Sequence, residues 1–192
     1  MNKTHKAKVW ATTLLVILLA GVFVAMFYAV NTKFPESKKI VHPYGRPFIY
    51  EGAKITVKGK KILDSGQFAS DKELLHILNP DDTRSDLSDT KIAIVDLDFY
   101  NPANRPINVD LTAFHLESGS FSLQFDFPLM AYYNKCGMNL ELNKYEHKVL
   151  KMPVPLNRAS FSKSEWPHIQ GKTFYIVYSL YPEKNIVELP PQ

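Results

Sequence analysis

Four aspartates gather in one polar stretch of the chain, at Asp81, Asp82, Asp86 and Asp89. Carboxylates in such a cluster suit Ca²⁺, because this ion takes several oxygen ligands at once. The stretch reads DDTRSDLSD, which lacks the alternating spacing of a calcium-binding loop, and Arg84 would compete with a bound cation. We therefore expect a solvated loop and no metal, and an ion- or ligand-binding surface domain stays open as an alternative.

The histidines are the other residues that could hold a metal ion. They stand at positions 5, 42, 76, 115, 147 and 168, without the H-x-H or H-E-x-x-H spacing of a zinc site. The sequence also lacks a G-x-S-x-G elbow, a phosphate-cradling glycine loop and a nucleotide fingerprint. We predict no catalytic residues, no metal site and no cofactor.

Cys136 is the single cysteine, so an internal disulfide is excluded. His76 or His115 upstream and Arg158 downstream follow the residue order of the sortase transpeptidases, which are single-span surface enzymes. The sortase cysteine ends a T-L-x-T-C strand, whereas here Tyr-Tyr-Asn-Lys precedes the cysteine and a glycine follows it. These neighbours favour a turn with a structural or exposed thiol. A sortase-like, Cys-dependent surface enzyme is the alternative.

An uncharged run, residues 9–30, lies between Lys8 and Lys33. At about 1.5 Å per residue it makes a helix of roughly 33 Å, enough to cross the hydrocarbon core of a bilayer. The run is longer than the apolar part of a secretory signal and ends without a convincing A-x-A cleavage site. We predict an uncleaved, single-pass signal anchor in the cell membrane, preceded by a cytoplasmic tail of residues 1–8. A cleaved signal is the alternative.

The charge of the chain after residue 30 limits its possible partners. The net charge is +4, but three of the 23 basic residues and none of the 19 acidic residues lie in residues 1–30, which leaves the rest of the chain one charge positive. Nucleic-acid binders are usually far more basic, so we exclude that class of partner. The expected partners are the lipid bilayer and an envelope protein or cell-wall polymer. Lys54, Lys58, Lys60 and Lys61 would meet an anionic polymer or lipid, or protect a strand edge.

We expect a spacer over residues 31–46 and one domain over 47–192. In the domain the apolar residues recur with a period of two, which is typical of strands. The clearest strand covers residues 91–100, where alternate residues from Ala93 to Phe99 would face a core and a neighbour would cover Ile92 and Ile94. Further strands are expected around residues 48–63, 107–116, 121–125 and 149–156. The last two are an aromatic strand at 173–181, with Leu180 on its core face, and an edge strand at 186–189.

Two capping patterns interrupt the strands. Ser70, three residues before Glu73, predicts the start of a short helix that ends at Asn79 and Pro80. Ser162 and Glu165 repeat the pattern before Trp166 and predict a single helical turn. The insert at residues 70–89 is our first choice for a contact loop, because long loops in compact domains are often functional.

Several segments resemble the small immunoglobulin-like domains of uncharacterised Gram-positive surface proteins and lipoproteins. The similar segments are KITVKGKKIL, KIAIVDLDFYNPANRPINV and AFHLESGSFSL, together with residues 144–155 and 174–181. Tyr145-Glu146 replaces the usual Gly-Glu, and the insert at 70–89 is long. The resemblance implies an immunoglobulin-like sandwich and an interaction or envelope-associated role without known catalysis.

The sequence thus predicts a mainly β protein: an N-terminal transmembrane helix followed by an immunoglobulin-like antiparallel β-sandwich with one short helical insert. Its expected function is that of a non-enzymatic binding or scaffolding module outside the cell membrane.

Overall fold

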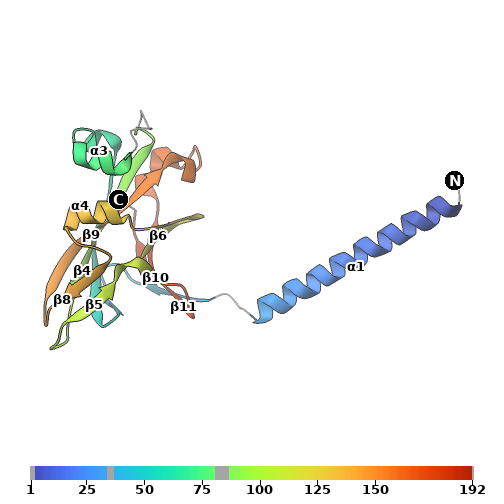
Figure 1. Ribbon diagram of the computed structural model, residues 1–192, viewed down its shortest axis with the longest axis horizontal. Helices are drawn as coiled ribbons and strands as arrows, with labels where there is room; N and C mark the ends of the chain where they lie inside the picture. Colours follow the sequence, from blue (N-terminus) through green and yellow to red (C-terminus); the bar gives the residue numbers. More distant parts are fainter. Residues whose placement is uncertain (1–2, 34–36, 81–86, 192) are drawn as a thin grey trace. The chain divides into compact units, whose positions relative to one another are not determined.

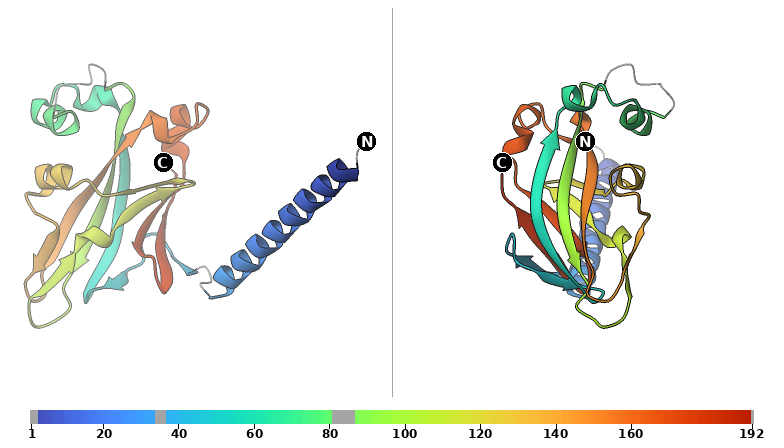
Figure 2. Two further views of the ribbon diagram at one scale, coloured as in Figure 1. Left: turned by 45° about the vertical axis from the view of Figure 1, so that its right-hand side comes forward. Right: turned by 90° about the vertical axis from the view of Figure 1, so that its left-hand side faces the viewer.

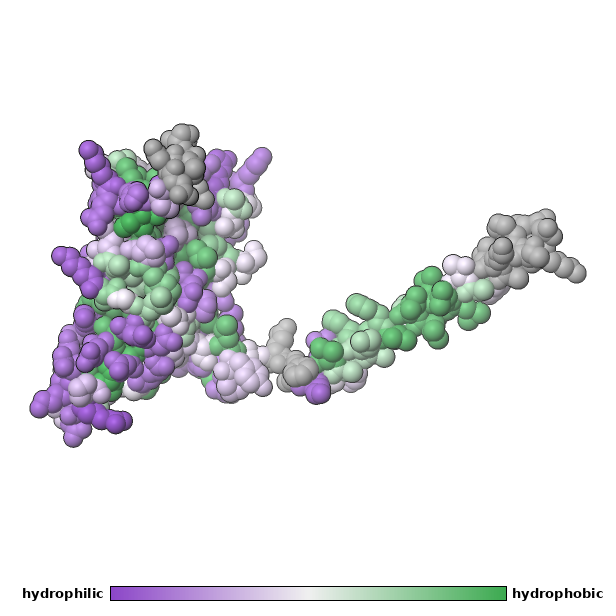
Figure 3. All heavy atoms as spheres, viewed as in Figure 1, coloured by the Kyte–Doolittle hydropathy of each residue, from purple (hydrophilic) through white to green (hydrophobic). Residues whose placement is uncertain are grey.

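The structure is a computed structural model that describes residues 3–33, 37–80 and 87–191. It divides into two compact units, Met1–Lys38 and Lys39–Gln192. Helix α1 (Lys3–Lys33) makes up most of the first unit. Its part Trp10–Lys33 contains an 18-residue stretch with a mean hydropathy of 2.6, and Figure 3 shows the hydrophobic residues along it. By length and composition this helix is a signal sequence or a membrane anchor.

The second unit contains two larger sheets and a two-stranded ribbon (Figures 1 and 2). The four-stranded sheet has the order β2 (Phe48–Tyr50), β3 (Ala53–Leu63), β4 (Thr90–Tyr100) and β9 (His147–Asn157). The five-stranded sheet has the order β1 (Lys38–His42), β11 (Glu183–Leu189), β10 (Phe174–Ser179), β6 (His115–Ser118) and β7 (Phe121–Gln124). The ribbon pairs β5 (Ile107–Asp110) with β8 (Asn139–Leu142).

The main core lies between the two larger sheets. Ala93, Val95, Leu97 and Phe99 on β4 are all fully buried, as the period of two predicts. They belong to one hydrophobic cluster with side chains of the other sheet such as Ile176. The sheets also meet through stacked aromatic rings, and the ring centroids of Phe48 and Tyr178 are 4.3 Å apart. The domain is therefore a β-sandwich.

A second, smaller cluster covers the outer face of β4. Ile92 and Ile94 are fully buried there, so the prediction that a neighbour covers them is confirmed. The cover comes from short helices, α2 (Ser65–Phe68), α3 (Lys72–Leu78) and α4 (Phe127–Asn134). Helix α3 is the predicted short helix, but its N-cap is Asp71 rather than Ser70, because the Asp71 carboxylate accepts the N–H of Leu74.

Helix α4 was not expected from the sequence. It begins after Asp126, whose carboxylate accepts the N–H of Leu129, and it has Pro128 in its first turn. Both are signals for the start of a helix. The residues around Cys136, predicted to form a turn, follow directly after this helix, which ends at a left-handed Lys135.

Three features of the strands and the spacer differ from the sequence prediction. The spacer predicted at 31–46 begins inside α1, which continues to Lys33, and it contains β1, which pairs with β11. Strand β11 therefore lies between β1 and β10 and is not an edge strand. Leu180, placed on the core face of the aromatic strand, follows the end of β10 and is 53% exposed.

Three 3₁₀ helices complete the described part: η1 (Leu111–Ala113), η2 (Arg158–Ser160) and η3 (Trp166–Gly171). The predicted helical turn before Trp166 is confirmed. The N–H of Glu165 donates to Ser162 Oγ and the N–H of Ser162 donates to Glu165 Oε2, which is a reciprocal capping box.

Candidate binding groove beside strand β7

The acidic cluster can be followed only in part, because Asp81, Asp82 and Asp86 lie outside the described residues. Asp89 is described, and its carboxylate forms an ion pair with Arg158 at 3.2 Å. The carboxylate of Asp89 is thus already paired with a cation. Within the described residues, no group of three His, Cys, Asp or Glu side chains could hold a metal ion.

Cys136 is half-buried and packs against the main core. Burial raises the pKa of its thiol, and the charge of Lys148 opposes that rise only in part. Two of the residues considered as catalytic partners are engaged elsewhere or exposed: Arg158 pairs with Asp89, and His76 is exposed on α3. The third, His115, lies on β6, and its Nδ1 is buried without a hydrogen-bond partner among the described residues. The thiol therefore stays protonated at neutral pH, which is unfavourable for a nucleophile.

His42 and His147 contact aromatic and polar neighbours within the fold. Nε2 of His42 on β1 lies 2.7 Å from the Tyr178 hydroxyl of β10 and 3.1 Å from Asn185 Oδ1 of β11. These contacts link β1 to the two neighbouring strands. His147 stacks on Tyr100 with ring centroids 4.2 Å apart. His115 and His168 lie on β6 and η3, and the side chain of His5 is outside the description.

The predicted lysine patch does not form one surface. Lys58 is paired with Asp98 at 3.1 Å on the outer face of the sheet. Lys60, beyond a β-bulge after Val57, turns inward and lies over the ring of Phe174 at 5.2 Å. Burial lowers the pKa of Lys60. Strand β2 pairs only with residues 53–55 of β3, so Lys58, Lys60 and Lys61 lie along the part of β3 that β2 leaves unpaired, whereas Lys54 pairs with Ile49.

Cations and aromatic rings alternate at the end of the core near η3. Lys91 lies over Trp166 at 5.4 Å, and Lys172 lies over Phe161 at 5.7 Å. Phe161 in turn contacts Phe121 of β7, with centroids 4.9 Å apart. These contacts close the end of the sandwich and fix the position of the segment that follows η2.

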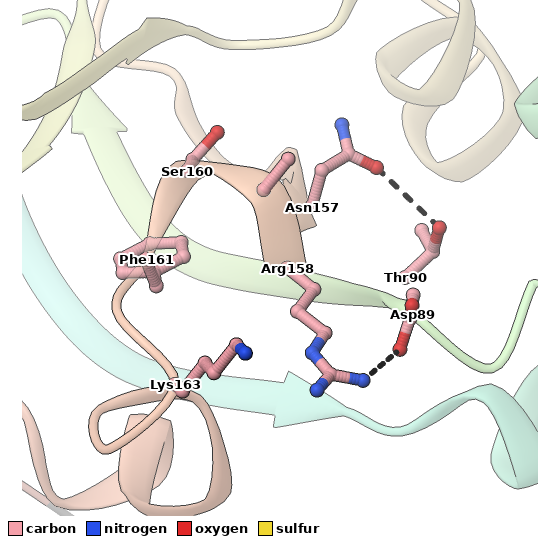
Figure 4. Close-up of a pocket in the computed structure, with 8 residues that line it drawn as sticks. Asp89, Thr90, Asn157, Arg158, Ser160, Phe161 and Lys163 are labelled. Carbon is pink, nitrogen blue, oxygen red and sulfur yellow. Dashed lines mark hydrogen bonds and ion pairs between the residues drawn. The ribbon is translucent and has the colours of Figure 1, made fainter.

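An open hollow of about 700 Å³ lies beside this end, at the corner where β9 passes into η2 (Figure 4). The corner is fixed by backbone and side-chain bonds. Arg158 N–H donates to the Asp89 carbonyl at 3.0 Å, and Thr90 Oγ1 donates to Asn157 Oδ1 at 3.4 Å. Lys163, Phe161 and the Ser160 hydroxyl complete the lining. Within the described residues no carboxylate pairs with Lys163.

A second hollow of about 340 Å³ continues along β7 and shares Asn157 and Ser160 with the first. Its other lining residues come from β7, from the turn before it and from β9: Ser120, Phe121, Ser122, Leu123 and Pro155. We call the two hollows together the β7 groove. It combines apolar surface, hydroxyl groups, an amide and one cation without a described partner, which suits binding of a polar ligand with apolar parts.

Sequence reasoning missed this groove. It predicted the strand at 121–125 and named Arg158, but as a partner of Cys136. The residues of the corner carry no motif, and only the pairing of the strands shows that β7 ends a sheet.

The described fold is a β-sandwich domain that follows an apolar helix in the sequence. The family described as "Domain of unknown function (DUF5028)" matches residues 46–185. The chain belongs to this family. No curated protein matches the chain.

Three solved structures are similar to the chain. A candidate lipoprotein, ycdA of Bacillus subtilis subsp. subtilis str. 168, has 16% sequence identity and a TM-score of 0.46; the match covers 76% of this chain but only 38% of that one. An uncharacterized β-sandwich protein of Clostridium difficile 630 has 10% identity and a TM-score of 0.40 over 80% of this chain and 95% of that one. A functionally unknown protein of Listeria monocytogenes EGD-e has 8% identity and a TM-score of 0.47 over 78% and 85%.

Proposed function

We propose that this protein is a membrane-anchored, non-enzymatic binding module of the bacterial cell envelope, whose β7 groove binds an envelope protein or a wall polymer. Helix α1 is then an uncleaved signal anchor with the domain outside the cell. The domain is an immunoglobulin-like sandwich, in line with the resemblance of its strand segments. Only residues 34–37 separate α1 from β1, so the rigid domain follows the anchor with little linker between them in sequence.

The β7 groove carries this proposal. It is formed by ordered elements: β7 pairs with β6, the N–H of Arg158 at the start of η2 bonds to the Asp89 carbonyl, and the ring of Phe161 contacts that of Phe121. A groove held in this way is preorganised for a ligand and loses little entropy on binding. The lining offers hydrogen-bonding groups and a cation but, among the described residues, no arranged nucleophile and base. Binding therefore fits the site better than catalysis.

Photo-crosslinking in living cells tests the proposal. A benzophenone amino acid at Leu123, which is 39% exposed at the groove, samples any ligand that lies there. The matched control position is Val149, a 57% exposed apolar residue on β9 of the other sheet. We expect a discrete, light-dependent adduct at position 123 and none of that mass at position 149.

Two outcomes would overturn the proposal. One is the absence of any adduct at Leu123 in cells that contain the full-length protein. The other is the same mixture of adducts at both positions, which would mean random collisions in the envelope.

A further inference from the structure

We infer that the β7 groove takes an extended peptide segment, which adds as a sixth strand to the five-stranded sheet and places an acidic side chain against Lys163. This rests on the proposed function and names the ligand class for the same groove. The partner is then a protein of the envelope that offers an extended, acidic segment.

The hairpin geometry shows which backbone groups of β7 are available. Ser118 pairs with Phe121 across a two-residue turn in which Gly119 has a φ of +61°. The two residues that flank such a turn share two backbone hydrogen bonds. Farther along the hairpin, pairs without backbone hydrogen bonds alternate with hydrogen-bonded pairs. Ser122 and Gln124 therefore direct their N–H and C=O groups away from β6. Among the described residues, no other backbone bond reaches β7.

The edge of β7 also lacks the charges and prolines that protect many exposed edges. Its sequence, Phe-Ser-Leu-Gln, contains no charge and no proline. By contrast, β1 begins with two lysines, and β9 carries Pro153 and Pro155. The carbonyl of Pro153 is occupied by the N–H of Asp126 at 2.9 Å. Strand addition is therefore possible at β7 and hindered at β9.

The side chains around this edge define the segment that fits. Leu123 and Pro155 offer apolar contacts beside β7 for one face of an added strand. At the η2 end, Arg158 is neutralised by Asp89, whereas Lys163 has no described acidic partner (Figure 4). An acidic side chain of the ligand would supply that partner. An anionic wall polymer fits less well, because it would bring repeated charges to a hollow that contains Asp89.

The added strand must be short. After Gln124 the chain crosses to the other sheet, where Asp126 bonds to Pro153, so the crossing closes the groove at that end. An incoming segment can pair with residues 121–124 only, and its affinity must depend strongly on each backbone bond.

The test uses the full-length chain in lipid nanodiscs and a library of random ten-residue peptides as the probe. We expect bound peptides to alternate apolar and polar residues and to carry an acid near one end. Ser122→Pro removes the outward N–H and keeps the pairing with β6, because proline is tolerated where an edge N–H faces outward. Loss of this bond should weaken binding by about tenfold or more. The matched variant Ser122→Ala loses the hydroxyl but keeps the N–H, so it should bind at least about fivefold more tightly than Ser122→Pro.

A second pair of variants keeps the test decisive if Ser122→Pro fails to fold. Lys163→Glu should weaken binding of the acidic peptides by about tenfold, whereas Lys54→Glu, on the exposed outer face of the other sheet, should not. Equal binding to Ser122→Pro and Ser122→Ala would overturn strand addition, and so would failure to select any peptide while a wall polymer binds. The in-cell adduct at Leu123 would survive either of those results, so failure of this inference is distinct from failure of the proposed function.

Discussion

The side-chain amide of Asn134 forms two hydrogen bonds with the backbone of Lys151: Nδ2 donates to the carbonyl at 2.7 Å, and Oδ1 accepts the N–H at 2.8 Å. Asn134 ends α4, and Lys151 lies in β9, the outer strand of the four-stranded sheet. The amide thus takes the place that a neighbouring strand would occupy. Strand β7 has no comparable cover among the described residues, and this difference between the two edges is the reason why we propose β7 as the ligand-binding edge.

Replacing Asn134 with Ala should expose the edge of β9. Because both bonds to Lys151 are lost and that backbone is left partly unpaired, we expect a loss of about 1–2 kcal/mol in the free energy of unfolding and more self-association at high concentration. Urea denaturation and light scattering measure the two effects. Asn104→Ala, at an exposed loop position, is the control. A variant that matched this control in both assays would show that the amide does not protect the edge.

Asn101 should be one of the most sensitive polar positions. It is fully buried, and its Nδ2 donates to the carbonyls of Arg105 and Asn143, both at 2.8 Å, while its Oδ1 accepts the N–H of Ala103 at 2.9 Å. Asn101→Ala removes these hydrogen bonds from a fully buried side chain and should cost about 3 kcal/mol. Urea denaturation checks this value.

The control for that experiment is Asn108→Ala, at an exposed position on β5. It should change the free energy of unfolding by about 0.5 kcal/mol or less. Equal effects at positions 101 and 108 would contradict the assigned role of Asn101.

Stability should fall in acid partly through Glu165. The hydrogen bond from Lys172, with those from Ser162, lowers the pKa of Glu165 from 4.5 to about 2. A carboxylate with a lowered pKa in the folded state stabilises the fold above its unfolded pKa, and this stabilisation is lost as the pH falls from about 4.5 through about 2. Glu165→Gln should therefore flatten the pH dependence of thermal unfolding in this window. Glu141→Gln, at an exposed position on β8, should leave the pH dependence unchanged. Identical curves for both variants would exclude the role of Glu165.

The thiol of Cys136 should react slowly. Because burial raises its pKa, little thiolate is present at neutral pH. A membrane-impermeant maleimide added to intact cells should label Cys136 much more slowly than the denatured protein, and the rate should rise with pH beyond 9, the ordinary value. Rapid labelling at neutral pH would contradict a structural thiol and favour the Cys-dependent enzyme.

The insert at residues 70–89 should prove structural as well as exposed. Leu74 of α3 is 3% exposed and packs in the cluster that covers Ile92 and Ile94. Leu74→Ala should lower the free energy of unfolding by about 3 kcal/mol. The exposed neighbour His76→Ala should have little effect in the same denaturation assay. If both variants were neutral, the packing of α3 on the sheet would not contribute to the stability of the domain.

Much of the fold follows from local pattern. The alternation in β4 predicted its buried face, and consecutive apolar residues at 92–95 predicted cover on both faces, because a strand exposed on one side alternates strictly. Helix α4 was missed since its apolar residues also fit a strand period and the cap at Asp126 was not recognised.

The candidate site could not be predicted in the same way. Residues 121–124 read as an ordinary strand, and whether a strand lies at an edge depends on which distant segment pairs with it. Likewise Arg158 meets Asp89 because β4 and β9 lie side by side, although 69 positions separate these residues in the sequence. Pairing partners at such separation leave no local signal.

Hydrogen exchange at β7 tests the central claim most directly. The full-length protein is compared in native membranes, where its partners are present, and in nanodiscs after purification. If a ligand pairs with β7, the amides of Ser122 and Gln124, which point away from β6, should exchange at least about tenfold more slowly in native membranes. The amides of residues 147–150 on β9 should exchange at the same rate in both preparations. Equal exchange of Ser122 and Gln124 in both preparations would contradict a ligand at the β7 groove.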